Sequence, residues 1–202
     1  MQRFKRYEVL LKQFSWLDAK KHLASSAATI RYPNTQMDLV RMGILQFGFF
    51  PTQEIFVHYA SKFKTNQNPL LPVLSWKTHV MDVKTVKAGE FVGYGTSYFT
   101  NHTTKIALVP VGYAFGYSRS LSNHGKVLIN GARFDVIGSV NMSMLEVNIT
   151  MDDAIKKGDE VVLIGTQGDQ ELSVSSFSDF SQLINYELLT RLPDDIPRII
   201  TE

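Results

Sequence analysis

The chain of 202 residues contains no cysteine, and this absence sets the first limit on its chemistry. Without thiols it forms no disulfide bond and no thiolate metal site, and a reducing, cytoplasmic setting is permitted. The five histidines stand at positions 22, 58, 79, 102 and 124, and none lies three to five residues from another. That spacing lacks the local pattern of a metal site, so we expect no metal centre.

Long apolar runs and long basic runs are also missing. No stretch approaches the ~20 apolar residues of a membrane span, and Met1–Arg6 lacks the apolar core of a secretion signal. The 21 basic and 19 acidic residues nearly balance, so the charge does not call for a nucleic-acid partner. With 44% hydrophobic and 20% charged residues, the composition is that of a soluble globular protein with a substantial core.

Residues 91–119 hold two tyrosines that each follow a glycine at the end of an apolar run. Tyr94 is flanked by glycines on both sides, and Tyr113 follows Gly112. Glycine permits a positive φ and removes bulk, so such a tyrosine can stand clear of a sheet with its hydroxyl exposed. A phenol, with a normal pKa of ~10, acts as a proton donor or base when a nearby cation lowers that pKa. A pair of ordinary strand-end tyrosines explains the same pattern, and the residues alone leave both interpretations open.

The first third of the chain reads as pieces of an α/β unit. Residues 3–15 carry an apolar stripe at helical spacing, which predicts a helix. A short strand at 20–24 leads into small hydroxyl residues at 25–29 that open a helix. Backbone N–H groups at such a junction can cradle an anion, and a plain helix N-cap is the alternative.

Arg41 lies inside the apolar, strand-like run 37–50, immediately before Met42 and Gly43. A buried or half-buried arginine there needs a partner, whereas a strand-end arginine reaches water along its own stem. The polar stretch 53–72 indicates a connector or a domain boundary.

From Val73 onward the alternation of apolar and polar residues predicts strands joined by short turns. Asn130-Gly131 predicts a hairpin, whose loop can exceed two residues. A strand at 141–150 is expected to turn Met142, Met144 and also Leu145 inward. The other expected elements are strands at 74–80, 126–129, 134–137 and 161–164, a turn at 165–169 and a helix at 173–189. The predicted fold is therefore mainly β, with roughly eight strands and one helix after the α/β piece.

Several short stretches occur in an order that carries more information than any one of them. They are His22-Leu-Ala-Ser-Ser-Ala-Ala28, Val40-Arg-Met-Gly-Ile44, Val92-Gly-Tyr-Gly95, Val111-Gly-Tyr-Ala114 and Asn185-Tyr-Glu187, with residues 126–144 and 158–165 in support. This ordered set resembles the C-terminal part of the alanine racemases, a family of pyridoxal-phosphate enzymes. The likeness covers nearly all 202 residues.

The resemblance implies a role for each matching residue. Tyr94 would be the catalytic base on one face of the substrate α-carbon, and Arg41 would hydrogen-bond the pyridine nitrogen of pyridoxal 5'-phosphate. A guanidinium there keeps that nitrogen unprotonated, which favours simple proton return. The remaining cofactor-binding residues would be Ser26, Gly43, Ile44 and Tyr186 at the phosphate, together with His22. The substrate-binding residues would be Tyr113 and Met142 in the pocket and Arg119 on the approach to it.

The resemblance also implies an architecture. Residues 1–65 would be the C-terminal remnant of a cofactor-binding (β/α)8 barrel, and residues 66–202 the β-barrel-like C-terminal domain. In this family the β domain of one subunit completes the active site on the barrel of another. A homodimer with shared sites is therefore expected, acting on alanine in the cytoplasm to supply D-alanine for cell-wall peptidoglycan.

The chain also departs from the family pattern. Nothing matches the motif of the Schiff-base lysine, so this polypeptide alone is expected to be inactive, and a β-domain fragment that serves only in dimerisation is an alternative. A related barrel-plus-β-domain decarboxylase is a third reading, which the Tyr94 motif disfavours. The unusual residues are Ser25, Phe115, Ser139, Asn141 and Ser143. They bear on the entrance corridor and substrate selectivity more than on the chemistry.

Overall fold

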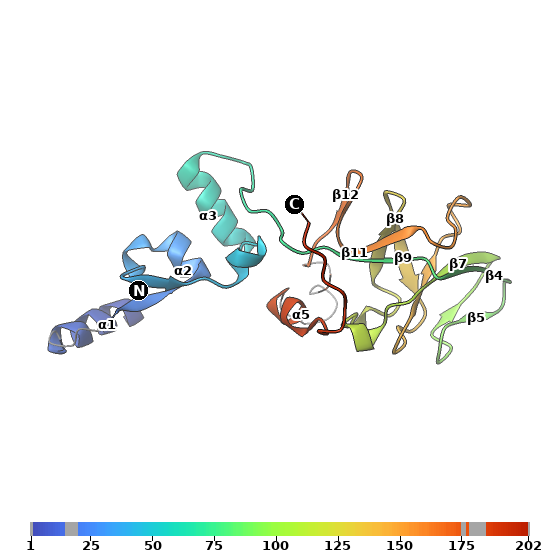
Figure 1. The fold of residues 1–202 in the computed structure, drawn as a ribbon, viewed down its shortest axis with the longest axis horizontal. Helices are drawn as coiled ribbons and strands as arrows, with labels where there is room; N and C mark the ends of the chain where they lie inside the picture. Colours follow the sequence, from blue (N-terminus) through green and yellow to red (C-terminus); the bar gives the residue numbers. More distant parts are fainter. Residues whose placement is uncertain (1, 15–19, 175–176, 178–184, 202) are drawn as a thin grey trace. The chain divides into compact units, whose positions relative to one another are not determined.

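The computed structural model describes residues 2–14, 20–174, 177 and 185–201, with only the backbone described at Arg3, Asn185 and Tyr186. The chain divides into two compact units, residues 1–73 and 74–202. Figure 1 shows unit 1 in blue to teal and unit 2 in green to red. Among the described helices, none is long and apolar enough to cross a membrane.

Unit 1 is built on two short parallel strands. The helix α1 (Gln2–Gln13) is followed by β1 (His22–Ser25), which runs directly into α2 (Ser26–Arg31). The second strand, β2 (Leu39–Arg41), pairs with β1 so that Ser25 lies opposite Arg41. The predicted strand–helix junction is thus confirmed, while the run 37–50 forms only three residues of strand before the 3-10 helix η2 (Ile44–Phe47). A further 3-10 turn, η1 (Pro33–Thr35), joins α2 to β2.

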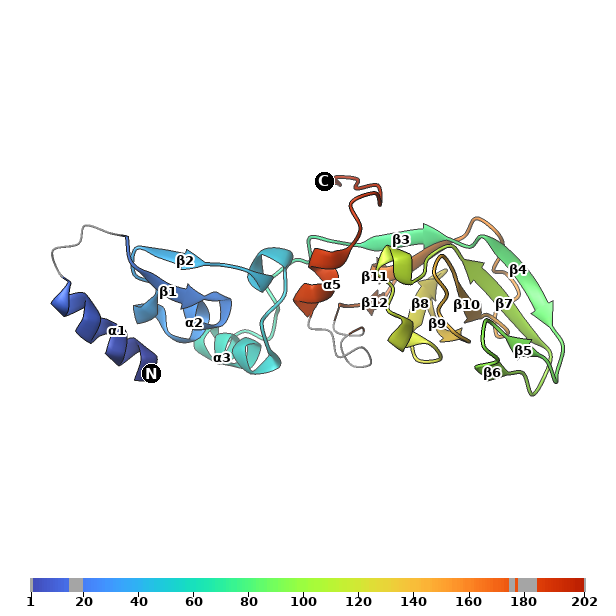
Figure 2. The ribbon, with the colours of Figure 1, turned by 90° about the horizontal axis from the view of Figure 1, so that it is seen from below.

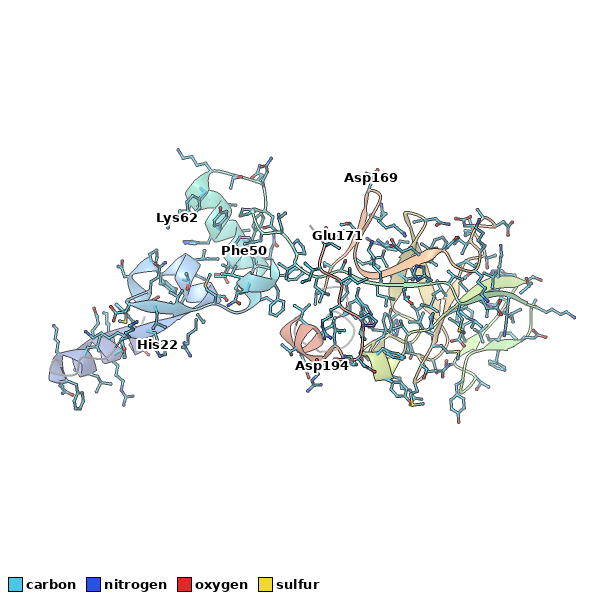
Figure 3. All side chains as sticks on the ribbon, in the orientation of Figure 1. His22, Phe50, Lys62, Asp169, Glu171 and Asp194 are labelled. Carbon is cyan, nitrogen blue, oxygen red and sulfur yellow. The ribbon has the colours of Figure 1, made fainter. Side chains whose placement is uncertain are left out.

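The prediction of a connector over 53–72 is wrong in its first half. Residues Gln53–Phe63 form the helix α3, whose N-cap Thr52 accepts a hydrogen bond from the backbone N–H of Ile55. The helix presents an aromatic face: the ring of Tyr59 lies 5.4 Å from Phe50 and 4.6 Å from Phe63. Figure 3 labels Phe50 just before this helix and His22 at the start of β1. The polar residues of α3 lie on its exposed side, and the polar, proline-containing stretch 64–72 follows directly, which explains why the composition of 53–72 as a whole concealed the helix.

Unit 2 contains an eight-stranded antiparallel sheet in the described part of the chain, in the order β12-β11-β8-β9-β10-β7-β4, with β3 paired to β11. Its strands are β3 (Trp76–His79), β4 (Asp82–Val86), β7 (Thr104–Val109), β8 (Lys126–Ile129), β9 (Ala132–Ile137), β10 (Leu145–Asn148), β11 (Glu160–Gln167) and β12 (Gln170–Leu172). The mainly β prediction is confirmed.

The core of this sheet follows from alternation. One face carries small and branched side chains that are wholly or almost wholly buried, and these pack as the main core of the unit. Its members are Ala107, Val109, Val127, Ile129, Val136, Leu145, Val147, Val161 and Leu163. Ile129 pairs with Ala132, so the Asn130-Gly131 loop has two residues, both at positive φ as this tight turn requires.

A separate hairpin, β5 (Phe91–Val92) with β6 (Tyr98–Phe99), stands beside the main sheet in Figure 2. Its loop carries Tyr94. Two further short 3-10 turns follow β7: η3 (Tyr113–Phe115) and η4 (Arg119–Leu121).

Three expectations for unit 2 need correction or restriction. Met142 does not face inward: it precedes β10 and is 58% exposed, while Leu145 takes the buried position. The strand expected to end at 164 continues to Gln167, because β12 pairs with its last three residues. The helix expected over 173–189 lies partly outside the described residues, and its described part is α5 (Asn185–Arg191).

Candidate functional site

The carboxyl-terminal ends of β1 and β2 bring the first group of predicted site residues together. Ser26 is buried, and its Oγ accepts a hydrogen bond of 2.9 Å from the backbone N–H of Gly43. Ile44 follows as the first residue of η2, so its N–H lies outside the bonds of that helix. These polar groups meet because parallel strands place their carboxyl ends at the same edge.

Arg41 is the last residue of β2, and its side chain is exposed rather than buried. Its Nη2 lies 3.4 Å from the carbonyl oxygen of Leu23, a long contact that leaves most guanidinium donors available. The guanidinium is thus held at the edge where Ser26 and Gly43 meet. His22 lies at the other end of β1, exposed, with no hydrogen bond to Arg41 in the described structure. Only the backbone of Tyr186 is described, at the start of α5 in unit 2.

In unit 2 one short segment, residues 138–142, supports the predicted catalytic hairpin. The backbone of Gly93 lies directly on this segment: a Cβ built at Gly138 would be 2.9 Å from the carbonyl oxygen of Val92. On the other side of the loop, the hydroxyls of Ser97 and Ser139 are hydrogen-bonded at 2.9 Å. Tyr94 at the tip is 74% exposed, as predicted from its flanking glycines.

The same 138–142 segment holds Tyr113. The backbone N–H of Tyr113 donates to the carbonyl of Asn141, and that of Ala114 donates to the carbonyl of Met142, each at 3.0 Å. This docking is possible because Gly112 has no side chain: a Cβ there would stand 2.1 Å from the Asn141 oxygen. Tyr113 and Met142 are therefore neighbours on the surface, 47% and 58% exposed.

Arg119 belongs to a third loop attached to this segment. It opens η4 and is exposed, and its carbonyl accepts a hydrogen bond of 2.5 Å from the hydroxyl of Ser122. The Ser122 hydroxyl oxygen in turn accepts a hydrogen bond of 3.0 Å from the backbone N–H of Val140. Three loops that bear predicted site residues thus contact the same five-residue segment, 138–142.

Beneath the hairpin lies a buried acid. Glu146 of β10 is 8% exposed, and its Oε2 has no hydrogen-bond partner among the described atoms. This oxygen lies 3.5 Å from where a Cβ of Gly93 would stand. Burial raises the pKa of the Glu146 carboxyl, since the charged form loses its hydration there.

Sequence reasoning missed two members of this arrangement. Glu146 lies between two apolar residues, Leu145 and Val147, and an acid at that place in a strand is the signal that could have found it. Asn123 bridges two distant segments by its side-chain amide, and nothing in the local pattern reveals such a bridge.

The comparisons with known proteins agree with one another. The family model for the alanine racemase C-terminal domain matches residues 73–200. The alanine racemase of Leptospira interrogans serovar copenhageni is 34% identical over 202 residues, which is 100% of this chain and 51% of the relative. That of Carboxydothermus hydrogenoformans is 39% identical over 197 residues, covering 96% of this chain and 51% of the relative.

Solved structures show the same likeness. Alanine racemase from Bartonella henselae with covalently bound pyridoxal phosphate has a TM-score of 0.84 and 29% identity, over 98% of this chain and 51% of that one. Alanine racemase from Bacillus anthracis with bound L-Ala-P has a TM-score of 0.80 and 34% identity, over 94% of this chain and 48% of that one.

The mainly β fold of this chain matches the C-terminal region of this class of racemase. The chain belongs to the alanine racemase family, and the predicted resemblance is confirmed. The chain spans about half the length of the curated relatives it matches.

Proposed function

We propose that this chain is the C-terminal part of a pyridoxal-phosphate-dependent alanine racemase that interconverts L-alanine and D-alanine in the cytoplasm for peptidoglycan synthesis. The observation that carries the proposal is the convergence of the Tyr94, Tyr113 and Arg119 loops on the 138–142 segment. Strand-end tyrosines with a merely structural role would not require a shared support or exposed rings.

The residues at the β1–β2 edge fit the cofactor. A phosphate needs several N–H and O–H donors, and Ser26 and Ile44 supply them beside Gly43: the Ser26 hydroxyl accepts from the Gly43 N–H and keeps its own proton to donate, and the Ile44 N–H lies outside the bonds of η2. The guanidinium of Arg41 suits the pyridine nitrogen, because it donates a hydrogen bond and does not give up its proton. When bound, the cofactor supplies an electron sink that makes the α-proton of the amino acid removable. His22 and Tyr186 complete the proposed set by resemblance alone.

Tyr94 is proposed to hold and return the α-proton on one face of the substrate. Its exposed hydroxyl at the end of a glycine-flanked loop is free to approach a substrate held by another surface. Tyr113 and Met142 would line the pocket, and Arg119 its approach. The resemblance assigns the second base to a lysine that this sequence does not match, so we propose that the polypeptide alone does not racemise alanine.

We further propose a homodimer in which Tyr94, Tyr113 and Met142 act on the barrel of the partner subunit. Their exposure supports this: an aromatic and thioether surface of this kind is typical of an interface or a ligand pocket.

The decisive experiment is Tyr94→Phe in the full-length racemase, measured in both directions of racemisation. This substitution keeps the ring and deletes the hydroxyl, so we expect a loss of ~10²–10⁴ in kcat, the usual size of a general acid–base contribution. Tyr113→Phe is the matched control and should act mainly on KM. Near-normal turnover in Tyr94→Phe would refute the catalytic assignment.

A fragment that serves only in dimerisation is the second candidate, favoured by the separate core of unit 2. Sedimentation of the 202-residue chain, with a racemisation assay on the same sample, separates the two. If the chain forms dimers that stay inactive when the N-terminal part of a racemase is added, the fragment that serves only in dimerisation is favoured.

A further inference from the structure

Asn123 joins the catalytic hairpin to the segment beneath it. Its Nδ2 donates a hydrogen bond of 3.0 Å to the carbonyl oxygen of Ser97, and its Oδ1 accepts one of 2.7 Å from the backbone N–H of Gly138. One partner is an acceptor and the other a donor, so only one orientation of the amide satisfies both. Gly138 is buried, and the bond to Asn123 therefore satisfies an N–H that water does not reach.

The backbone conformation of Asn123 orients its side chain for these two hydrogen bonds. It has a φ of 62°, in the left-handed region that asparagine tolerates better than most residues. The turn around it is fixed by hydrogen bonds from the N–H groups of His124 and Gly125 to the carbonyl of Leu121, at 3.0 and 2.8 Å. The amide thus projects from a rigid turn and loses little freedom in making its two bonds.

The hairpin itself has little stability of its own. Its two strands pair over only two residues each, Phe91 with Phe99 and Val92 with Tyr98. The tip offers no further anchor, since a Cβ at Gly95 would meet no atom within 4 Å. The position of Tyr94 therefore depends on where the loop touches the rest of unit 2.

We propose that Asn123 is a positioning residue that sets the place of Tyr94 by bridging Ser97 and Gly138. This inference rests on the proposed role of Tyr94 and goes beyond it. Asn123 and Ser97 are both exposed, so water can replace the bond between them at small cost to global stability. Water does not, however, fix the separation of two backbone segments as one planar amide does. Loss of Asn123 should accordingly loosen the hairpin while the core of the sheet stays intact.

Two substitutions separate the halves of the bridge. Asn123→Gly keeps the left-handed backbone and removes both bonds, whereas Asn123→Asp keeps the acceptor for Gly138 and loses the donor to Ser97. The control is Asn148→Ala, which removes two hydrogen bonds elsewhere in unit 2, both accepted by the Asn148 Oδ1, from the N–H and the hydroxyl of Thr150.

Amide hydrogen exchange on the 202-residue chain is the first readout and needs no activity. In Asn123→Gly, exchange at Gly138 and across residues 91–99 should rise about tenfold, the size of one lost hydrogen bond, relative to β8. In Asn123→Asp only the hairpin should respond, and in Asn148→Ala neither. Unchanged hairpin exchange in both Asn123 variants would overturn the proposal.

Kinetics of the full-length racemase are the second readout. A misplaced base should lower kcat by about 10–100-fold in Asn123→Gly while KM stays within about twofold, because small displacements of a reacting group cost this much. If Asn123 has only a structural role, its loss should reduce the folded fraction and leave kcat per folded enzyme unchanged. That result would also overturn the proposal that Asn123 positions Tyr94. If Tyr94→Phe keeps normal turnover, the proposed function fails, and the exchange result still decides whether Asn123 holds the hairpin.

Discussion

Gly112→Ala offers the sharpest test of how Tyr113 and Met142 are brought together. The added Cβ would stand 2.1 Å from the carbonyl oxygen of Asn141 and 2.6 Å from the carbonyl carbon and oxygen of Met142. These are backbone atoms, so no side-chain rotation relieves the overlap. The φ of Gly112 is −145°, which any residue adopts, and the cost therefore comes from lack of space alone.

The magnitude follows from what must move. Separating the two segments strains the packing by about 1–3 kcal/mol and breaks two backbone hydrogen bonds, from Tyr113 and Ala114, worth about 0.5–1.5 kcal/mol each. We expect Gly112→Ala to lower the free energy of unfolding by about 2–6 kcal/mol in urea denaturation of the 202-residue chain. Gly158→Ala is the control, since its Cβ meets no atom and only the positive φ costs about 1–2 kcal/mol. A loss for Gly112→Ala no larger than for Gly158→Ala would refute the steric reasoning.

Two further predictions concern buried polar groups. The raised pKa of Glu146 means that the folded state retains a proton that the unfolded state releases above pH ~4.3, so this group destabilises the fold progressively as pH rises from there to its folded pKa. Glu146→Gln should therefore be more stable than the native chain at pH 7 and lose that advantage near pH 4 in paired denaturation curves; a pH-independent difference would contradict this. Tyr117 is wholly buried against Trp76 and Phe177, with a hydroxyl unpartnered among the described residues. Tyr117→Phe should raise the thermal midpoint or leave it unchanged. A decrease in the free energy of unfolding of more than about 1 kcal/mol would show that the hydroxyl has a hydrogen-bond partner.

The sequence was informative wherever one local rule decides the structure. Alternation located the buried strands, and Asn130-Gly131 marked a two-residue hairpin, because that turn demands positive φ at both positions. Helix α3 was not predicted because its residues run directly into the polar, proline-containing stretch 64–72, although the helix itself carries several apolar and aromatic side chains. The exposure of Met142 was not predicted because the loop before β10 has the same alternation of apolar and polar residues as the strand.

The site shows the same division. The motifs named the tyrosines and the arginine, and their roles remain predictions. The residues that hold these loops in place could not be predicted from the sequence. Hydrogen bonds such as those of Asn123 join backbone groups far apart in the chain, so they depend on the tertiary structure. Periodicity and spacing carry no record of them.

The 138–142 segment holds its loops mainly through main-chain atoms: the N–H groups of Gly138 and Val140 and the carbonyls of Asn141 and Met142. Side chains at 141, 142 and 143 can therefore be exchanged with little effect on the positions of the loops that carry Tyr94, Tyr113 and Arg119. Under the proposed function, this makes the segment a place where substitutions can change the substrate range, or be engineered to reshape the proposed pocket, without rebuilding the fold. Positions 138–140 are different: Gly138 has no room for a Cβ, Val140 is buried, and the hydroxyl of Ser139 is hydrogen-bonded to that of Ser97. A library that leaves residues 138–140 unchanged and varies positions 141–143 should yield mostly folded proteins.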